Sequence, residues 1–217
     1  MDMRLKYQNE MVELNNELLK MAIIVRESLD RSLESLVTQN IVLAKNIIES
    51  DSEIDLMELE LCDKCAVLIA TEQPVARDLR VIVGALKIVT DLERMADLAC
   101  HVAKSTITLK DKNYTDQIDL ISEMVEIAGN MTKDSIIAFI HQDGKLAEEV
   151  AARDDLIDDL YNKVTKRILK VMIENPEEVE VGLNLIFLSR SIERYADHAE
   201  NICEWVVYTS TGIHKEL

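Results

Sequence analysis

The two halves of this chain repeat each other, and the repeat includes acidic side chains at matching positions. Residues 51–55, with the pattern Asp-x-x-Ile-Asp, return as residues 154–158 at an offset of 103 residues. Residues 92–97, Leu-Glu-Arg-Met-Ala-Asp, return as Ile-Glu-Arg-Tyr-Ala-Asp at 192–197, at an offset of 100 residues. Two matching segments in each half indicate an internal duplication. The chain is therefore expected to fold as two similar units.

Apolar residues recur at helical spacing along the whole chain. Only 5 glycines and 2 prolines occur in 217 residues, and 48% of the residues are apolar, which is typical of an all-α protein. Pro74 and Pro176 are expected to stop the second and fifth helices, because proline removes a backbone donor and clashes with the preceding turn. The predicted helices span residues 3–38, 41–71, 76–109, 115–141, 144–174 and 179–210.

Long helices joined by short turns are typical of up-down bundles. A helix of about 30 residues is roughly 45 Å long, so each half can form one elongated antiparallel unit. The pattern therefore predicts an all-α fold made of two tandem up-down three-helix bundles. The first bundle is expected over residues 1–110 and the second over residues 111–217.

Each half carries four carboxylates placed symmetrically about its proline turn. Asp55 and Glu93 are equally distant from Pro74 along the chain, and so are Asp51 and Asp97. If one helix runs into the turn and the next runs back, these residues meet at the same level of the bundle. The two predicted groups consist of Asp51, Asp55, Glu93 and Asp97 in the first half, and of Asp154, Asp158, Glu193 and Asp197 in the second.

Gathered carboxylates raise one another's pKa, so their clustering requires a compensating interaction. Asp51 and Asp154 fall at positions of the apolar seam where an aliphatic residue is expected, and a carboxylate there must be neutralised, paired or bound to a cation. Sets of oxygen ligands favour hard cations such as magnesium, calcium, manganese or ferric iron. The Glu-x-x-His pattern of di-iron oxidases is absent from the sequence. We therefore expect metal sites without a redox enzyme signature.

The net charge of −17 argues against a nucleic-acid partner and against direct adsorption to anionic lipid, since both need clustered lysine and arginine. The first residues lack the apolar core of a signal peptide. The longest apolar runs, such as 21–25 and 65–70, are too short to span a bilayer. The four cysteines show no disulfide spacing, so a cytoplasmic location is expected.

Other motifs carry weaker signals. Cys62 and Cys65 form a single C-x-x-C pattern within a helix, and packing accounts for it better than metal binding. His101 and His198 lie near the acidic groups and are either additional ligands or ordinary boundary residues. Trp205 and Tyr208 near the end of the last helix are packing residues or a partner-docking end.

Taken together, the motifs resemble those of the PhoU family of phosphate-uptake regulatory proteins. The resemblance rests on the two duplicated segments described above and on Pro74-Val75-Ala76-Arg77-Asp78-Leu79-Arg80 before the third helix, and it covers essentially the whole chain. Ala96 and Ala196 stand where family members often have glycine.

The resemblance implies two three-helix bundles that bind multinuclear clusters of iron or zinc at the eight carboxylates. It also implies a cytoplasmic, non-enzymatic adaptor, expected as a homodimer. Such an adaptor links the phosphate ABC transporter to the sensor histidine kinase of the phosphate regulon, so peripheral association with the inner face of the membrane through protein partners is expected. It represses the regulon when phosphate is plentiful and restrains uptake.

Three other interpretations stay open at this point. An accessory protein of a low-affinity phosphate carrier would share the fold. A carboxylate-bridged metalloenzyme would need an open coordination position and a catalytic acid or base, for which the sequence offers no further motif. A helical scaffold without metal is the simplest alternative, and metal analysis separates it from the other two.

Overall fold

The computed structural model describes residues 3–114 and 118–217, and this part of the chain contains helices and turns but no strand. The all-α prediction is therefore confirmed. The N-terminal helices are α1 (Met3–Val37), α2 (Ile41–Glu72) and α3 (Arg77–Thr108). The C-terminal half contains α4 (Ile118–His141), α5 (Gly144–Ala151), α6 (Asp154–Glu174), a 3-10 turn η2 (Pro176–Glu178) and α7 (Val179–Thr211).

Local sequence accounts for the ends of these helices. The Asn40 side chain accepts a hydrogen bond from the Leu43 amide at the start of α2, and Asp143 caps α5 in the same way, because the first amides of a helix lack partners within it. At the end of α2, Gln73 adopts a left-handed conformation directly before Pro74. The second proline, Pro176, opens the turn η2 after α6 ends, so both prolines stop a helix as predicted.

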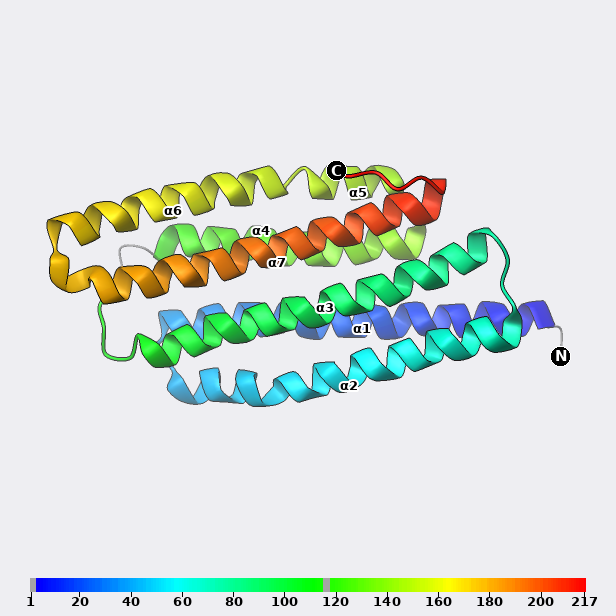
Figure 1. The fold of residues 1–217 in the computed structure, drawn as a ribbon. Coiled ribbons are helices and arrows are strands. Elements are labelled where there is room, and N and C mark those ends of the chain that lie inside the picture. Colours follow the sequence, from blue (N-terminus) through cyan, green and yellow to red (C-terminus); the bar gives the residue numbers. More distant parts are fainter. Residues whose placement is uncertain (1–2, 115–117) are drawn as a thin grey trace.

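The helices form two bundles that lie side by side along their length (Figure 1). Helices α1, α2 and α3 pack on one another in the first bundle, and α4, α6 and α7 do so in the second, with α5 covering α4 and α7. The bundles meet where α3 packs against α7 and α1 against α4. This arrangement confirms two tandem three-helix bundles, while the boundary between residues 110 and 111 stays a prediction.

A continuous apolar core runs through both bundles. In α1 the buried residues recur every three or four positions, as in Leu14, Leu18, Met21, Val25 and Leu29, so that one stripe of the helix faces inward. The same cluster includes side chains from α3, α4 and α7. The two bundles therefore share one core, which fixes the positions of the helices that carry the acidic groups.

One predicted helix is interrupted. The sequence predicts a single helix over 144–174, but α5 ends at Ala151 and α6 begins at Asp154. At the break, the Arg153 amide donates to Val150 O and the Leu156 amide donates to Arg153 O, which are the tighter i→i−3 bonds of a 3-10 turn. The Arg153 guanidinium donates to Asp134 on α4 at 2.7 Å. The predicted start of the fourth helix at 115–117 lies outside the described residues.

The interface between the bundles contains a close backbone approach and a buried polar pair. A Cβ atom at Gly84 of α3 would lie 2.5 Å from Cγ2 of Thr209 on α7, so glycine permits the contact. Farther along, His198 Nδ1 of α7 lies 2.9 Å from Asp91 Oδ1 of α3, and both side chains are nearly buried. Among the described residues, no helix combines the length and the apolar character needed to cross a membrane.

Candidate metal centre

The structure places the eight predicted residues in two groups, one in each bundle. The first carboxylate group lies between α2 and α3, and the second lies between α6 and α7, two pairs of helices that pack together. The first group consists of Asp51 and Asp55 on α2 with Glu93 and Asp97 on α3. The second group consists of Asp154 and Asp158 on α6 with Glu193 and Asp197 on α7.

In the first carboxylate group, the acids of the two helices act on one another. Burial raises the pKa of Asp51, and the charges of Asp97 and Asp55 raise it further, against a hydrogen bond from Cys100 that lowers it. Burial also raises the pKa of Glu93, followed by the charges of Asp97 and its other acidic neighbours. The charge of Asp97 on α3 thus acts on Asp51 on α2, the two residues that the symmetry about Pro74 pairs.

The second carboxylate group is more deeply buried and more strongly perturbed. Burial, together with the charges of Asp197 and Asp158, raises the pKa of Asp154 to about 6. Burial and the charge of Asp197 raise the pKa of Glu193 to about 7, although Arg190 lowers it. Glu193 is only 5% exposed. An acidic side chain with so little solvent around it needs a proton or a cation nearby.

The carboxylates of each group are neighbours without converging on one point. Within the described residues, no three His, Cys, Asp or Glu side chains are arranged so that together they could hold a metal ion. A bound cation would therefore require side-chain rotation within each group.

Two orphaned oxygen atoms in the second group fit a cation. Asp154 Oδ1 and Glu193 Oε2 are both buried and accept no hydrogen bond, and buried acceptors without partners are costly. The other oxygen of Glu193, Oε1, accepts from the Arg190 guanidinium one turn away. Carboxylate oxygens are ligands for hard cations and for iron or zinc, so the residues present suit the metals that the sequence predicts.

One further acidic residue borders each carboxylate group, and the sequence analysis assigned neither of these two residues to a site. The charge of Glu58 on α2 raises the pKa of Glu93, while Glu58 itself accepts a hydrogen bond from Thr90. Burial and the charge of Asp154 raise the pKa of Glu200 on α7 to about 7. The repeat gives no signal for either residue, because the position equivalent to Glu58 is Tyr161 and the position equivalent to Glu200 is Cys100.

The weaker motifs have structural partners. Cys62 and Cys65 are both unpaired thiols on α2, and Cys65 is fully buried, in keeping with a packing role. His198 forms a hydrogen bond with Asp91 across the bundle interface. This contact gives no reason to regard His198 as a metal ligand. His101 is exposed on α3.

Comparison with known proteins places the chain in a family. The model of the PhoU domain matches it twice, over residues 18–106 and 121–206, once in each bundle. The chain is 39% identical over 208 residues to the phosphate-specific transport system accessory protein PhoU homolog of Aquifex aeolicus, which covers 96% of this chain and 94% of that protein. It is 34% identical to the PhoU homolog 1 of Thermotoga maritima, over 95% of this chain and 89% of the relative.

Solved structures agree with the sequence relatives. The crystal structure of PhoU from Pseudomonas aeruginosa superimposes with a TM-score of 0.90 at 31% identity, over 95% of this chain and 100% of that one. The phosphate transport system regulatory protein PhoU from Streptococcus pneumoniae also gives 0.90, at 29% identity, over 97% of this chain and 100% of the other. Tandem helical bundles with duplicated acidic groups define the class of protein. The chain belongs to the PhoU family.

Proposed function

We propose that this protein is a metal-binding cytoplasmic adaptor that acts as a negative regulator of high-affinity phosphate uptake and of phosphate-regulon signalling. The observation that carries the proposal is family membership over nearly the whole chain, with relatives named phosphate-specific transport system accessory proteins. The acidic net charge of −17 and the absence of a membrane-crossing helix among the described residues suit an adaptor that works through protein contacts.

The metal would bind at the two carboxylate groups. Asp51, Asp55, Glu93 and Asp97 would hold it in the first bundle. Asp154, Asp158, Glu193 and Asp197 would hold it in the second. When bound, iron or zinc, or in their place manganese, magnesium or calcium, would neutralise the clustered carboxylates. Because the ligands come from two helices, binding would favour the folded state over the unfolded one.

The adaptor would contact the phosphate ABC transporter and the sensor histidine kinase of the phosphate regulon. Peripheral location at the inner face of the membrane would follow from these contacts, and the protein would act as a homodimer. Its role would be to change the state of its partners and not to catalyse a reaction, in keeping with relatives that are named accessory or regulatory proteins.

A phosphate-regulon reporter in a host that lacks this gene tests the regulatory proposal. With excess phosphate, reporter output should be high in the deletion strain and low once the wild-type gene is restored. Unchanged output would contradict the regulatory role and would favour an accessory function with a low-affinity carrier.

Variants in the same strain test whether the carboxylates contribute to regulation. The combination Asp51→Asn with Asp55→Asn should fail to restore low output. The matched control is Glu53→Gln with Glu60→Gln, which removes two exposed carboxylates from the same helix. Full repression by the Asp51→Asn, Asp55→Asn protein would show that the first carboxylate group is not needed for regulation.

A further inference from the structure

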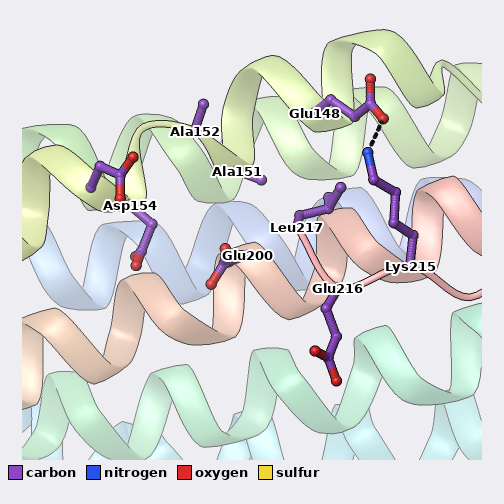
Figure 2. A pocket seen from close by; sticks show the side chains of 9 residues that line it. Glu148, Ala151, Ala152, Asp154, Glu200, Lys215, Glu216 and Leu217 are labelled. Carbon is purple, nitrogen blue, oxygen red and sulfur yellow. Dashed lines mark hydrogen bonds and ion pairs between the residues drawn. The ribbon is translucent and has the colours of Figure 1, made fainter.

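An acidic pocket lies beside the second carboxylate group, at the break between α5 and α6. Its volume is about 440 Å³, and its lining includes Glu148, Asp154, Asp155 and Glu200. Ala151 and Ala152 also line it, together with the segment that follows α7, including Lys215 and Leu217 (Figure 2). The pocket therefore gives access to Asp154, a predicted ligand whose buried Oδ1 has no hydrogen-bond partner.

The segment that lines one end of the pocket, residues 213–217, is here called the strap. It begins after Gly212, which ends α7 in a left-handed conformation with φ 81°, a backbone geometry that favours glycine. The strap then runs back along α7 toward α5 (Figure 2). Gly212 thus provides the reversal that brings the strap against α5 at one end of the pocket.

Three separate contacts hold the strap in place. The His214 ring packs edge-on against Trp205, with the ring centroids 5.5 Å apart. Lys215 Nζ lies 2.8 Å from Glu148 Oε1 on α5, and the Leu217 amide donates to Glu204 Oε1 on α7 at 3.2 Å. The strap therefore joins α7 to α5 at one end of the pocket, and Asp154 lies toward the other end (Figure 2).

The ion pair between Lys215 and Glu148 lies at the surface, whereas Leu217 is partly buried and packs against the core. The side chains of Lys215 and Glu148 are 56% and 50% exposed, and such ion pairs are weak and screened by salt. Ile213 is 69% exposed, so it adds little apolar burial. Lys215 also contributes a positive charge to a pocket whose other charged lining residues are acidic. An incoming cation would compete with the Lys215 ammonium group for these carboxylates.

We propose that the strap is a releasable cover that restricts the access of divalent cations to Asp154, with Lys215 as the built-in cation that holds it closed. The inference rests on the proposed metal binding at the second carboxylate group. Among the described residues, a strap of this kind is seen in the second bundle, whereas the described part of the chain after α3 leads away from α2 (Figure 1). The two bundles should therefore take up metal at different rates.

Trp205 reports directly on the docking of the strap, because it is the only tryptophan in the chain. Replacing Lys215→Gln should raise the acrylamide quenching constant of Trp205 at least twofold as His214 moves off the ring. Lys145→Gln is the matched control, since it removes an exposed lysine that pairs with Glu149 on α5 and changes the net charge equally. Equal quenching in the two variants would overturn the docking of the strap.

Stopped-flow uptake of Mn²⁺ tests the restriction of access. Both variants make the protein more acidic by one charge, so general electrostatic attraction cancels in their comparison. In an Asp51→Asn, Asp55→Asn background that isolates the second bundle, uptake should be at least threefold faster with Lys215→Gln than with Lys145→Gln. Equal rates would overturn the cover. If no variant bound Mn²⁺, the proposed metal site would fail and the restriction with it, whereas the quenching result would still decide whether the strap docks.

Discussion

At the scale of single residues, the main unfavourable electrostatic term in this protein is the burial of the Glu193 carboxylate. Its carboxylate is almost fully buried, one oxygen pairs with Arg190 and the other has no hydrogen-bond partner. The neighbouring charge of Asp197 adds to the effect of burial. A glutamate in these surroundings is disfavoured as an anion unless a second cation joins the Arg190 guanidinium. Replacing Glu193 should therefore affect the stability of the metal-free protein and that of the metal-bound protein in opposite directions.

Replacing Glu193→Gln should stabilise the metal-free protein in a pH-dependent way. The folded state keeps the proton up to a pKa of about 7, compared with the usual 4.5, so the folded state binds more protons and the wild type loses stability as pH rises through this range. The variant should gain about 1–3 kcal/mol relative to wild type between pH 4.5 and pH 8. Melting temperatures in chelator at pH 5 and pH 8 measure this, and a difference that does not change with pH would contradict it.

At pH 8, bound metal should make the wild type more stable than the Glu193→Gln variant, the reverse of their order without metal. A ligand that binds only the folded state raises its stability, and Glu193→Gln removes one predicted ligand. Adding Mn²⁺ should therefore raise the melting temperature of the wild type more than that of the variant. An equal rise in both would exclude Glu193 as a ligand.

At the scale of helices, the contact between α3 and α7 depends on one small residue and one polar pair. Gly84 allows α3 to approach Thr209 of α7. Asp91 and His198 bridge the same two helices, whereas the equivalent positions of the repeat are Ser191 and Leu98. The duplication is thus exact at the acidic groups and broken at the interface between the bundles.

Replacing Gly84→Ala should destabilise the protein. The added Cβ would lie 2.5 Å from Cγ2 of Thr209, and overpacking of this kind costs about 1–3 kcal/mol, partly offset by the higher helix propensity of alanine. Gly129→Ala is the matched control on α4, where the nearest atom is 3.4 Å away on the Arg26 side chain. Urea unfolding should show a loss for the first variant and no loss for the second; similar effects of both would refute the close approach.

Replacing His198→Leu should leave Asp91 buried without its partner. Loss of one member of a buried polar pair costs about 1–3 kcal/mol, and adding Asp91→Ser should restore part of it, because the double variant copies the residues of the repeat. Denaturant unfolding of both single variants and the double variant gives the coupling energy. Additive effects would show that the two side chains do not interact.

The sequence predicted helix ends correctly where a local pattern marks them, and it missed a helix end where no pattern does. Apolar spacing and the two prolines located the ends of α2 and α6, because proline stops a helix by its own chemistry. The break at Ala152 and Arg153 was missed, since both residues favour helices and the turn depends on the distant partner Asp134. Glu200 was missed because a cysteine replaces it in the first repeat.

At the scale of the whole molecule, two bundles share one core while each keeps its own acidic group between its second and third long helices. The sequence predicted the two bundles and one acidic group in each, because the duplication preserves the spacing of the carboxylates about each turn, but it did not predict the shared core. It could not predict the strap, since residues 213–217 follow the last helical pattern and their contacts with Glu148 and Glu204 depend on the tertiary fold. The two carboxylate groups are therefore expected to bind metal independently of each other.

Metal content tests this central claim most directly. Protein purified without chelators or an affinity tag should contain metal in both bundles, measured by inductively coupled plasma mass spectrometry. Asp51→Asn with Asp55→Asn should lose the metal of the first bundle only, and Asp154→Asn with Asp158→Asn that of the second only. Glu53→Gln with Glu60→Gln should keep the wild-type content. If both Asp→Asn proteins retained as much metal as the wild type, the carboxylate groups would not be its binding sites.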